Sequence, residues 1–155
     1  MNTDTSTLVA PKHLDMHCED DLFIAHVRGP YDAAVAWSME RTYRAQVEQY
    51  GYRLVLIHAD KMTTITPEAR RLMAEWNAAR IDPAAGAVVG ASFTTKTVAR
   101  LLTRAVEMIT GKPIHIRFFD SEPDARAWLD GQRVRLEREI AIISRSTIKA
   151  PDACA

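Results

Sequence analysis

The chain has 155 residues with 47% hydrophobic content, which suits one globular domain with a single core. Twenty basic and twenty acidic residues cancel, so no overall charge attracts the protein to nucleic acid or to an anionic membrane. No apolar run approaches the ~20 residues of a membrane span, and the start Met1–Thr7 is too polar for a signal peptide. Cys18 and Cys154 make a poor disulfide framework. We therefore expect a cytoplasmic protein with no nucleic-acid partner and no integral membrane segment.

Strand patterns alternate with helix patterns along the chain. Leu22–Arg28 and Arg53–Ala59 are apolar on both faces, as strands inside a sheet are. Gly29-Pro30 is expected to end the first of these strands, and a loop is expected over 60–65. The expected strands cover residues 13–18, 22–28, 53–59, 86–90 and 114–118.

The expected helix ends carry capping signals. Asp32 can cap a helix that ends at Gly51, and Thr66-Pro67-Glu68 combines a hydroxyl cap with a first-turn proline and an acid. A third helix is expected to end at Thr110, and a fourth to begin at Ser121. The third helix has a regular apolar stripe, expected to face the core: Val98, Leu101, Leu102, Ala105, Met108 and Ile109.

This order of elements predicts an α/β fold, with a mixed sheet of about five strands flanked by about four helices and its first two strands paired as a hairpin. We expect one domain over 13–131, preceded by a flexible tail over 1–12 and followed by a helical extension and flexible tail over 132–155. An apolar seam recurs at helical spacing in the extension: Leu136, Ile140 and Ile143. The seam either contacts a second copy or a partner, or folds back onto the domain.

The stretch Val88–Thr97, VVGASFTTKT, comes within one residue of the phosphate-binding loop G-x-x-x-x-G-K-[ST]. Thr95 occupies the place of the second glycine, and a β-branched side chain disfavours the backbone angles required there. The candidate for a Mg²⁺-binding aspartate, Asp60, precedes the loop, which reverses the usual order. We therefore expect a capped helix start, in which Thr94 or Thr95 satisfies free backbone N–H groups and contributes about 1 kcal/mol.

The same helix start remains a candidate for binding, because helix N-termini attract anions. The residues that could hold a phosphate or carboxylate are Ser92, Thr94, Thr95 and Lys96. A basic ridge recurs every four residues along the helix: Lys96, Arg100 and Arg104. This basic ridge is either an ordinary solvated face or a docking surface for an anionic partner.

No catalytic or metal-binding set can be named from the sequence. The five histidines are spread over different expected strands and lack the spacing of metal ligands. Ser92 lacks the final glycine of a nucleophile elbow, while Cys18 shares the apolar face of its strand and Cys154 lies in the tail. We expect no catalytic residue, no metal and no cofactor.

Three segments carry a family resemblance: LVLIHAD at 54–60, ITPEARR at 65–71 and FFDSEPDARAWL at 118–129. They are similar to the SpoIIAA-like family, which is related in fold to STAS domains and to the lipid-binding lobe of SEC14-type proteins. The resemblance covers roughly Leu22 to Gln132. It implies a single STAS-like domain with a regulatory or ligand-binding role.

The phosphorylation site known in this family is not present in this sequence. In STAS-type anti-sigma-factor antagonists a kinase phosphorylates a serine of a D-S-S-G motif, at the helix start that corresponds to Thr66–Ala69 here. Pro67 or Glu68 holds the place of that serine. Thr63, Thr64 and Thr66 keep hydroxyls nearby, where a phosphate would meet the positive end of the helix.

The sequence therefore favours a non-enzymatic STAS-like regulatory module that acts by binding a protein partner or a second copy of itself. The candidate surfaces are Thr63–Arg71 and the basic ridge Lys96–Arg104. The alternative is a carrier or sensor of a small apolar, lipid-like ligand, as the SEC14 likeness implies.

Overall fold

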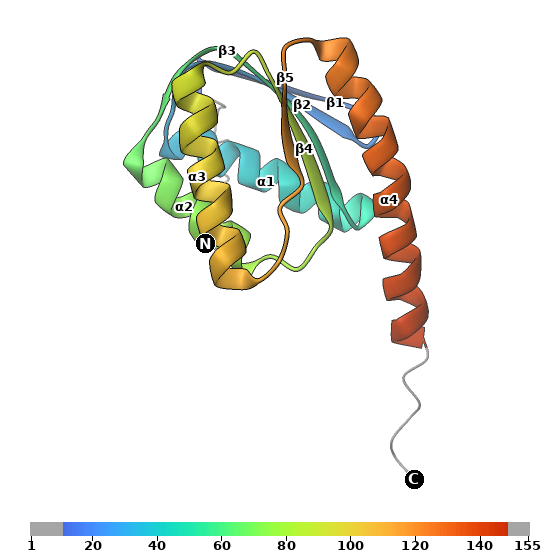
Figure 1. Cartoon of the computed structure of the whole chain (residues 1–155). Coiled ribbons are helices and arrows are strands. Elements are labelled where there is room, and N and C mark those ends of the chain that lie inside the picture. The colour runs from blue at the N-terminus through green and yellow to red at the C-terminus, as the bar shows by residue number, and fades with distance from the viewer. Residues whose placement is uncertain (1–10, 149–155) are drawn as a thin grey trace, which may run out of the picture.

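Strands and helices alternate along the chain as the sequence predicted (Figure 1). The computed structural model describes residues 11–148, with the elements β1 (Leu14–Glu19), β2 (Leu22–Tyr31), α1 (Ala33–Tyr50), β3 (Arg53–Ile65), α2 (Pro67–Ala79), β4 (Ala84–Val89), α3 (Phe93–Thr110), β5 (Ile116–Phe119) and α4 (Glu122–Ile148). The strands form one sheet in the order β1-β2-β3-β4-β5, in which β1 is antiparallel to β2 and the other neighbours are parallel. The expected mixed sheet with an N-terminal hairpin is confirmed.

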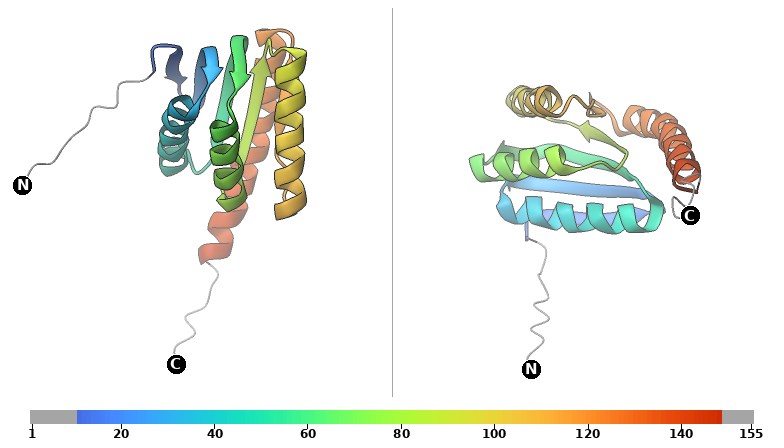
Figure 2. Two further views of the ribbon diagram at one scale, coloured as in Figure 1. Left: turned by 90° about the vertical axis from the view of Figure 1, so that its left-hand side faces the viewer. Right: turned by 90° about the horizontal axis from the view of Figure 1, so that it is seen from below.

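The helices cover both faces of the sheet. Figure 2 shows α1, α2 and α3 side by side on one face and α4 on the other. One buried cluster joins β2 and β3 to α1 and α2 and contains Phe23 and Met39. A second cluster joins the opposite face to α4 and contains Leu56 and Leu129. Because helices pack on both faces, β2 and β3 are apolar on both sides.

The helix ends follow the local capping signals. The Asp32 carboxylate accepts a hydrogen bond from the Val35 N–H at 3.0 Å, and the Thr66 hydroxyl accepts one from the Ala69 N–H at 3.3 Å. Gly51 ends α1 in the left-handed conformation, with φ of +80°. Each cap satisfies backbone groups that the helix itself leaves free.

Two strands extend further than the sequence predicted. β2 continues through Gly29-Pro30 to Tyr31, and β3 continues through residues 60–65. The two extensions pair with each other, and register shifts at His26/Arg28 and Gly29/Pro30 absorb the glycine and the proline. Strand pairing therefore overrides the local break signals, and it carries Tyr31 into the core.

The apolar stripe of α3 faces the core only in part, which corrects the prediction: Val98 packs against the cluster that contains Met39, whereas Leu101, Met108 and Ile109 face outward. Leu101 is 65% exposed, and Met108 and Ile109 are each 80% exposed. The inward side of α3 instead carries the buried Thr95 and Val106. The periodicity of an amphipathic helix defines an apolar face, but it does not determine what that face contacts.

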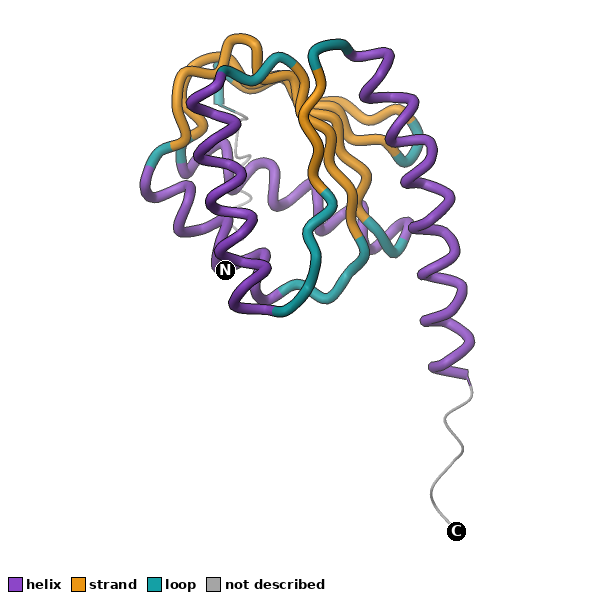
Figure 3. The backbone as a smooth tube through the Cα atoms, in the orientation of Figure 1, coloured by secondary structure: helices purple, strands orange, loops and turns teal. Residues whose placement is uncertain are grey.

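α4 continues without a break across the expected boundary at residue 131 (Figure 3). Leu136 is fully buried in the cluster under α4, and Ile140 packs against the same cluster. Ile142 and Ile143 are exposed. Leu136 and Ile140 of the seam therefore pack onto the domain, while Ile143 is about half exposed. None of the helices within residues 11–148 is long and apolar enough to cross a membrane.

A buried carboxylate ties α4 to the sheet. Asp21, in the turn just before β2, accepts hydrogen bonds from the Tyr52 hydroxyl at 2.5 Å and from the Arg133 Nε at 2.7 Å. Burial alone would raise the pKa of Asp21, but these hydrogen bonds together hold it below the usual 3.8. The ionised form of Asp21 is therefore the form that stabilises the fold.

We expect Asp21→Asn to lower the free energy of unfolding by about 1.5–3 kcal/mol at neutral pH, because it weakens two charge-assisted hydrogen bonds. The pKa of Asp21 is lower in the folded state than in the unfolded state, so its carboxylate stabilises the fold at pH values above the unfolded-state pKa and loses this effect as the pH falls. The difference in unfolding free energy between Asp21→Asn and the wild type should therefore shrink below about pH 4. Urea unfolding at a series of pH values measures this. Asp20→Asn is the control, since Asp20 is exposed; an equal loss in both variants would contradict the role of Asp21.

Candidate functional site

The hydroxyl-rich start of α3 is a capped helix end. The Ser92 hydroxyl accepts a hydrogen bond from the Thr95 N–H at 3.2 Å and donates one to the Thr95 hydroxyl at 3.0 Å. Ser92 is thus the cap, in place of the expected Thr94 or Thr95; Thr94 is exposed and Thr95 is buried. The polar groups at this helix start satisfy the backbone of the helix itself.

The basic ridge is partly engaged within the molecule. The Lys96 ammonium lies 3.7 Å from the Asp120 carboxylate, and the Arg100 guanidinium lies 5.5 Å from the centre of the Phe118 ring. Arg104 is exposed. The Lys96 and Arg100 side chains therefore lie against the end of β5.

The threonines before α2 are placed separately from the ridge. Thr63 and Thr64 are exposed near the end of β3, and Thr66 caps α2. The structure joins Ser92 to Thr95 by hydrogen bonds but gives no comparable contact between this pair and Thr63 or Thr64 within residues 11–148. The sequence-predicted residues thus form two surfaces, and of these residues Thr95 is the one that lines a cavity.

That cavity, of about 440 Å³, lies between the sheet and the inward side of α3, with α1 and α2 contributing further walls. Its apolar walls include Val55, Ile57, Met62, Met73, Leu102 and Val106. The inward side of α3 presents small residues such as Ala99, which leaves room between the helix and the sheet. A mostly apolar hollow of this size is typical of sites for small organic ligands.

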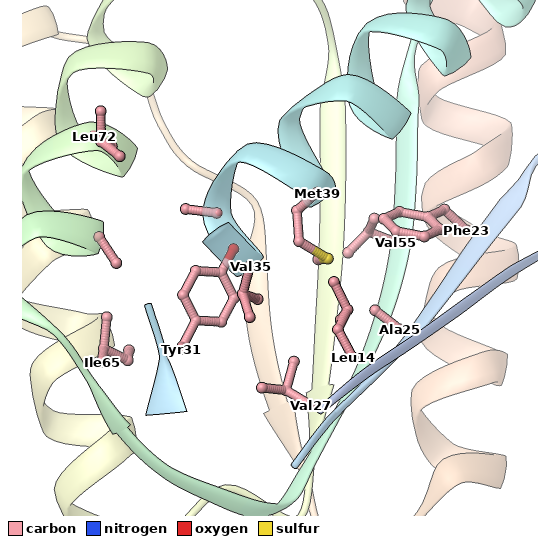
Figure 4. Packing of buried hydrophobic residues seen from close by; sticks show 12 residues of the cluster. Leu14, Phe23, Ala25, Val27, Tyr31, Val35, Met39, Val55, Ile65 and Leu72 are labelled. Atoms are coloured by element: carbon pink, nitrogen blue, oxygen red, sulfur yellow. The ribbon is translucent and has the colours of Figure 1, made fainter. Parts of the chain in front are cut away.

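Two tyrosines place polar groups in this apolar space. Tyr31 is 6% exposed, and Figure 4 shows it packed beside Val35 and Ile65. Within residues 11–148 the Tyr31 and Tyr43 hydroxyls make no hydrogen bond to the protein, although both residues line the cavity. Burial raises the pKa of Tyr31 well above its usual value and that of Tyr43 to about 12, so both phenols stay neutral.

Two arginines approach the ring of Tyr43. The guanidinium carbons of Arg53 and Arg80 each lie 5.5 Å from its centre. Arg53 donates a hydrogen bond to Asp82 at 2.6 Å, and Arg80 forms an ion pair with Glu40. Burial lowers the pKa of Arg80 from its usual value. Tyr43, Arg53 and Arg80 thus group hydrogen-bonding side chains in one part of the cavity, whose lining also includes the polar residues Thr95, Lys112, His115 and Arg135.

Sequence reasoning missed this cavity. Tyr31 lies beyond the point where Gly29-Pro30 was expected to end the strand, so the sequence did not place its side chain in the core. A signal was present in α3, whose inward side carries Thr95, Ala99 and Thr103 at helical spacing. Small residues that face a sheet leave space between the helix and the sheet. Which side of α3 faces the sheet, however, becomes known only once the helix is packed in the structure.

Three histidines that the sequence separates meet on the α4 face of the sheet. The ring centres of His17 and His26 are 6.3 Å apart, those of His26 and His58 are 4.2 Å apart, and both pairs are stacked. The His58 Nε2 lies 3.1 Å from a Glu122 oxygen. Burial and the neighbouring His58 lower the pKa of His26. No three potential ligands within residues 11–148 are arranged to hold a metal ion.

Comparisons with known proteins place the fold. Neither the protein-family models nor the curated proteins gave a match. An uncharacterized protein of the DUF3478 family from Shewanella loihica PV-4, described as having a SpoIIAA-like fold, is 14% identical with a TM-score of 0.53, and the match covers 75% of this chain and 91% of that one. The unphosphorylated anti-sigma factor antagonist SpoIIAA is 12% identical with a TM-score of 0.47, over 79% and 97% of the two chains. With five strands in a mixed sheet and four helices, the protein has the SpoIIAA-like α/β fold that its sequence segments predicted.

Proposed function

We propose that the protein is a non-enzymatic STAS-like module that binds a small apolar molecule, as a carrier or sensor within the cytoplasm. The cavity of about 440 Å³ under α3 carries this proposal. Its volume lies within the range of about 300–1,000 Å³ of small-molecule sites, and its walls are mostly apolar, with polar side chains among them. The polar groups around Tyr43 are a neutral phenol and two paired arginines, Arg53 with Asp82 and Arg80 with Glu40.

A cavity-filling substitution tests the proposal. Ala99 lines the cavity from α3, whereas Ala105 is exposed on the same helix. We expect Ala99→Phe to weaken binding of the neutral fluorophore N-phenylnaphthylamine by at least about tenfold, because the ring occupies the ligand's space. Ala105→Phe, the matched control, should bind as the wild type does. Thermal melts confirm that both variants fold.

The proposal fails if fluorescence titration shows no saturable binding to the wild type. It also fails if Ala99→Phe and Ala105→Phe bind the fluorophore equally well. Native mass spectrometry of freshly purified protein supplies an independent measurement, because a retained ligand would appear as an adduct of small-molecule mass.

A second candidate function is binding of a protein partner through α3. Phe93, Leu101, Met108 and Ile109 expose apolar side chains along this helix. Apolar surface gathered in this way is typical of interaction sites. Because the opposite side of α3 lines the cavity, ligand and partner would contact the same helix, which suits a regulatory module.

Pull-down from the native lysate tests this second function. Leu101→Glu places a charge within the exposed apolar stripe, and Ile142→Glu places the same charge on an exposed position of α4. We expect a specific partner to be lost with Leu101→Glu and retained with Ile142→Glu. Equal retention by both variants would count against the α3 surface.

A further inference from the structure

Two histidine rings lie face to face near the start of α4. His26 on β2 and His58 on β3 are partners in the parallel ladder, so their side chains leave the same face of the sheet. The rings are parallel, and their centres are 4.2 Å apart. This is the face that α4 covers (Figure 2). The His26–His58 stack therefore lies where the sheet meets the first turn of α4.

Glu122, in the first turn of α4, connects the helix to this stack. One Glu122 oxygen lies 3.1 Å from the His58 Nε2, and the other accepts a hydrogen bond from the Arg126 Nε at 2.7 Å. Arg126 also donates to both oxygens of Glu19 on β1, at 2.8 and 3.3 Å. The start of α4 is thus tied to β1 by a permanent charge and to β3 by a group that can gain or lose one.

The contact between His58 and Glu122 depends on the charge of the imidazole. The His58 Nε2 is buried, but it is not aligned with the carboxylate well enough to form a hydrogen bond. The contact is therefore weak while the ring is neutral. A proton on His58 turns it into an ion pair, in which attraction requires less exact alignment.

The stack favours one added proton, on His58. Two imidazolium rings with centres 4.2 Å apart would repel each other. Burial and the neighbouring His58 lower the pKa of His26, and Glu122 is the carboxylate within ion-pair distance of the stack among residues 11–148. β4 contributes the apolar Val89 beside His58. The other charged or titratable groups near the stack contact one another: Asp15 with Arg28, His17 with Glu19, and Glu19 with Arg126.

We propose that His58 and Glu122 form a proton-operated latch that ties the first turn of α4 to β3. The latch tightens when His58 takes up a proton and loosens when the ring is neutral. An imidazole changes its charge between about pH 5 and pH 8, so the start of α4 is held more firmly at about pH 6 than at about pH 8. This inference is independent of the cavity under α3 and of the function proposed for it.

Amide hydrogen exchange in the wild-type protein tests the latch. The amides of residues 125–129 report opening of the first turns of α4, once the rates are corrected for the intrinsic effect of pH. We expect their protection factors to be at least about fivefold higher at about pH 6 than at about pH 8, because the latch gains a charge-assisted contact. The amides of residues 71–78 in α2, on the opposite face of the sheet, are the internal reference and should show no such gain.

Two matched substitutions identify the group responsible. His58→Gln keeps a polar side chain beside Glu122 but removes the titration, so the dependence of α4 protection on pH should disappear. His17→Gln removes another histidine of the same cluster, one that is exposed and lies 3.6 Å from Glu19. The pH dependence should persist in His17→Gln. Thermal melts confirm that both variants fold.

Three results would overturn the latch. The first is equal protection of residues 125–129 at the two pH values in the wild type. The second is a gain of the same size in α2, which would reflect a change in overall stability. The third is a pH dependence that survives in His58→Gln or is lost in His17→Gln. The first two need no variant, so they decide the question even if a substitution prevents folding.

Discussion

Replacing Leu136 with alanine is expected to lower the free energy of unfolding by about 2–5 kcal/mol, because the change removes buried methyl groups and leaves a cavity. Leu136, on α4, is 0% exposed and packs in the cluster that contains Leu54 and Leu56. It lies five residues past the boundary that the sequence suggested at 131. Urea unfolding followed by circular dichroism measures the difference.

Two controls apply the same kind of truncation at exposed positions. Ile142 lies on α4 and Leu101 on α3, and each is more than half exposed. We expect Ile142→Ala and Leu101→Ala to change stability by no more than about 0.5 kcal/mol. A small effect at Leu136 would show that the C-terminal part of α4 contributes little to the fold. A large loss of stability in Leu101→Ala would indicate that Leu101 faces the core, as the sequence predicted.

Replacing Arg80 with alanine is expected to destabilise the protein by about 3 kcal/mol. Removing one partner of a buried ion pair leaves the other charge uncompensated, at a typical cost of about 3–5 kcal/mol. The Arg80 side chain is 14% exposed and that of Glu40 is 5% exposed. Arg44 still contacts Glu40 in the variant, which keeps the expected loss at the lower end.

A double-mutant cycle checks the cause of that loss. Glu40→Gln in the Arg80→Ala background removes the uncompensated charge, so the double variant should be more stable than the sum of the two single losses predicts. Arg71→Ala is the control on α2, because Arg71 pairs with Glu75 at 2.7 Å on the surface. Such exposed pairs contribute about 0.3–0.5 kcal/mol. Strict additivity of Glu40→Gln and Arg80→Ala would contradict the buried pair.

The proposed ligand site and the stability of the protein depend on the same groups. Arg80 contributes to the fold through Glu40 and to the cavity through its place beside Tyr43. Tyr31, in contrast, lines the cavity with a hydroxyl that no described residue uses. Substitutions at Arg80 therefore combine folding and binding effects.

The sequence by itself determined the types and order of the elements. The caps at Asp32 and Thr66 and the helix end at Gly51 depend on groups within a few residues of one another, so local chemistry is sufficient. The two-faced apolar pattern of β2 and β3 likewise predicted strands covered by helices on both sides. These features are enough to predict an α/β fold with a mixed sheet.

Only the tertiary structure decided where the candidate site lies. Pairing between β2 and β3 extends both strands past Gly29-Pro30 and carries Tyr31 into the core. Packing of α3 turns Leu101, Met108 and Ile109 outward and leaves a cavity beneath Ala99. Both outcomes depend on contacts between residues far apart in the chain, because a periodic pattern specifies which side of an element is apolar but not what that side meets.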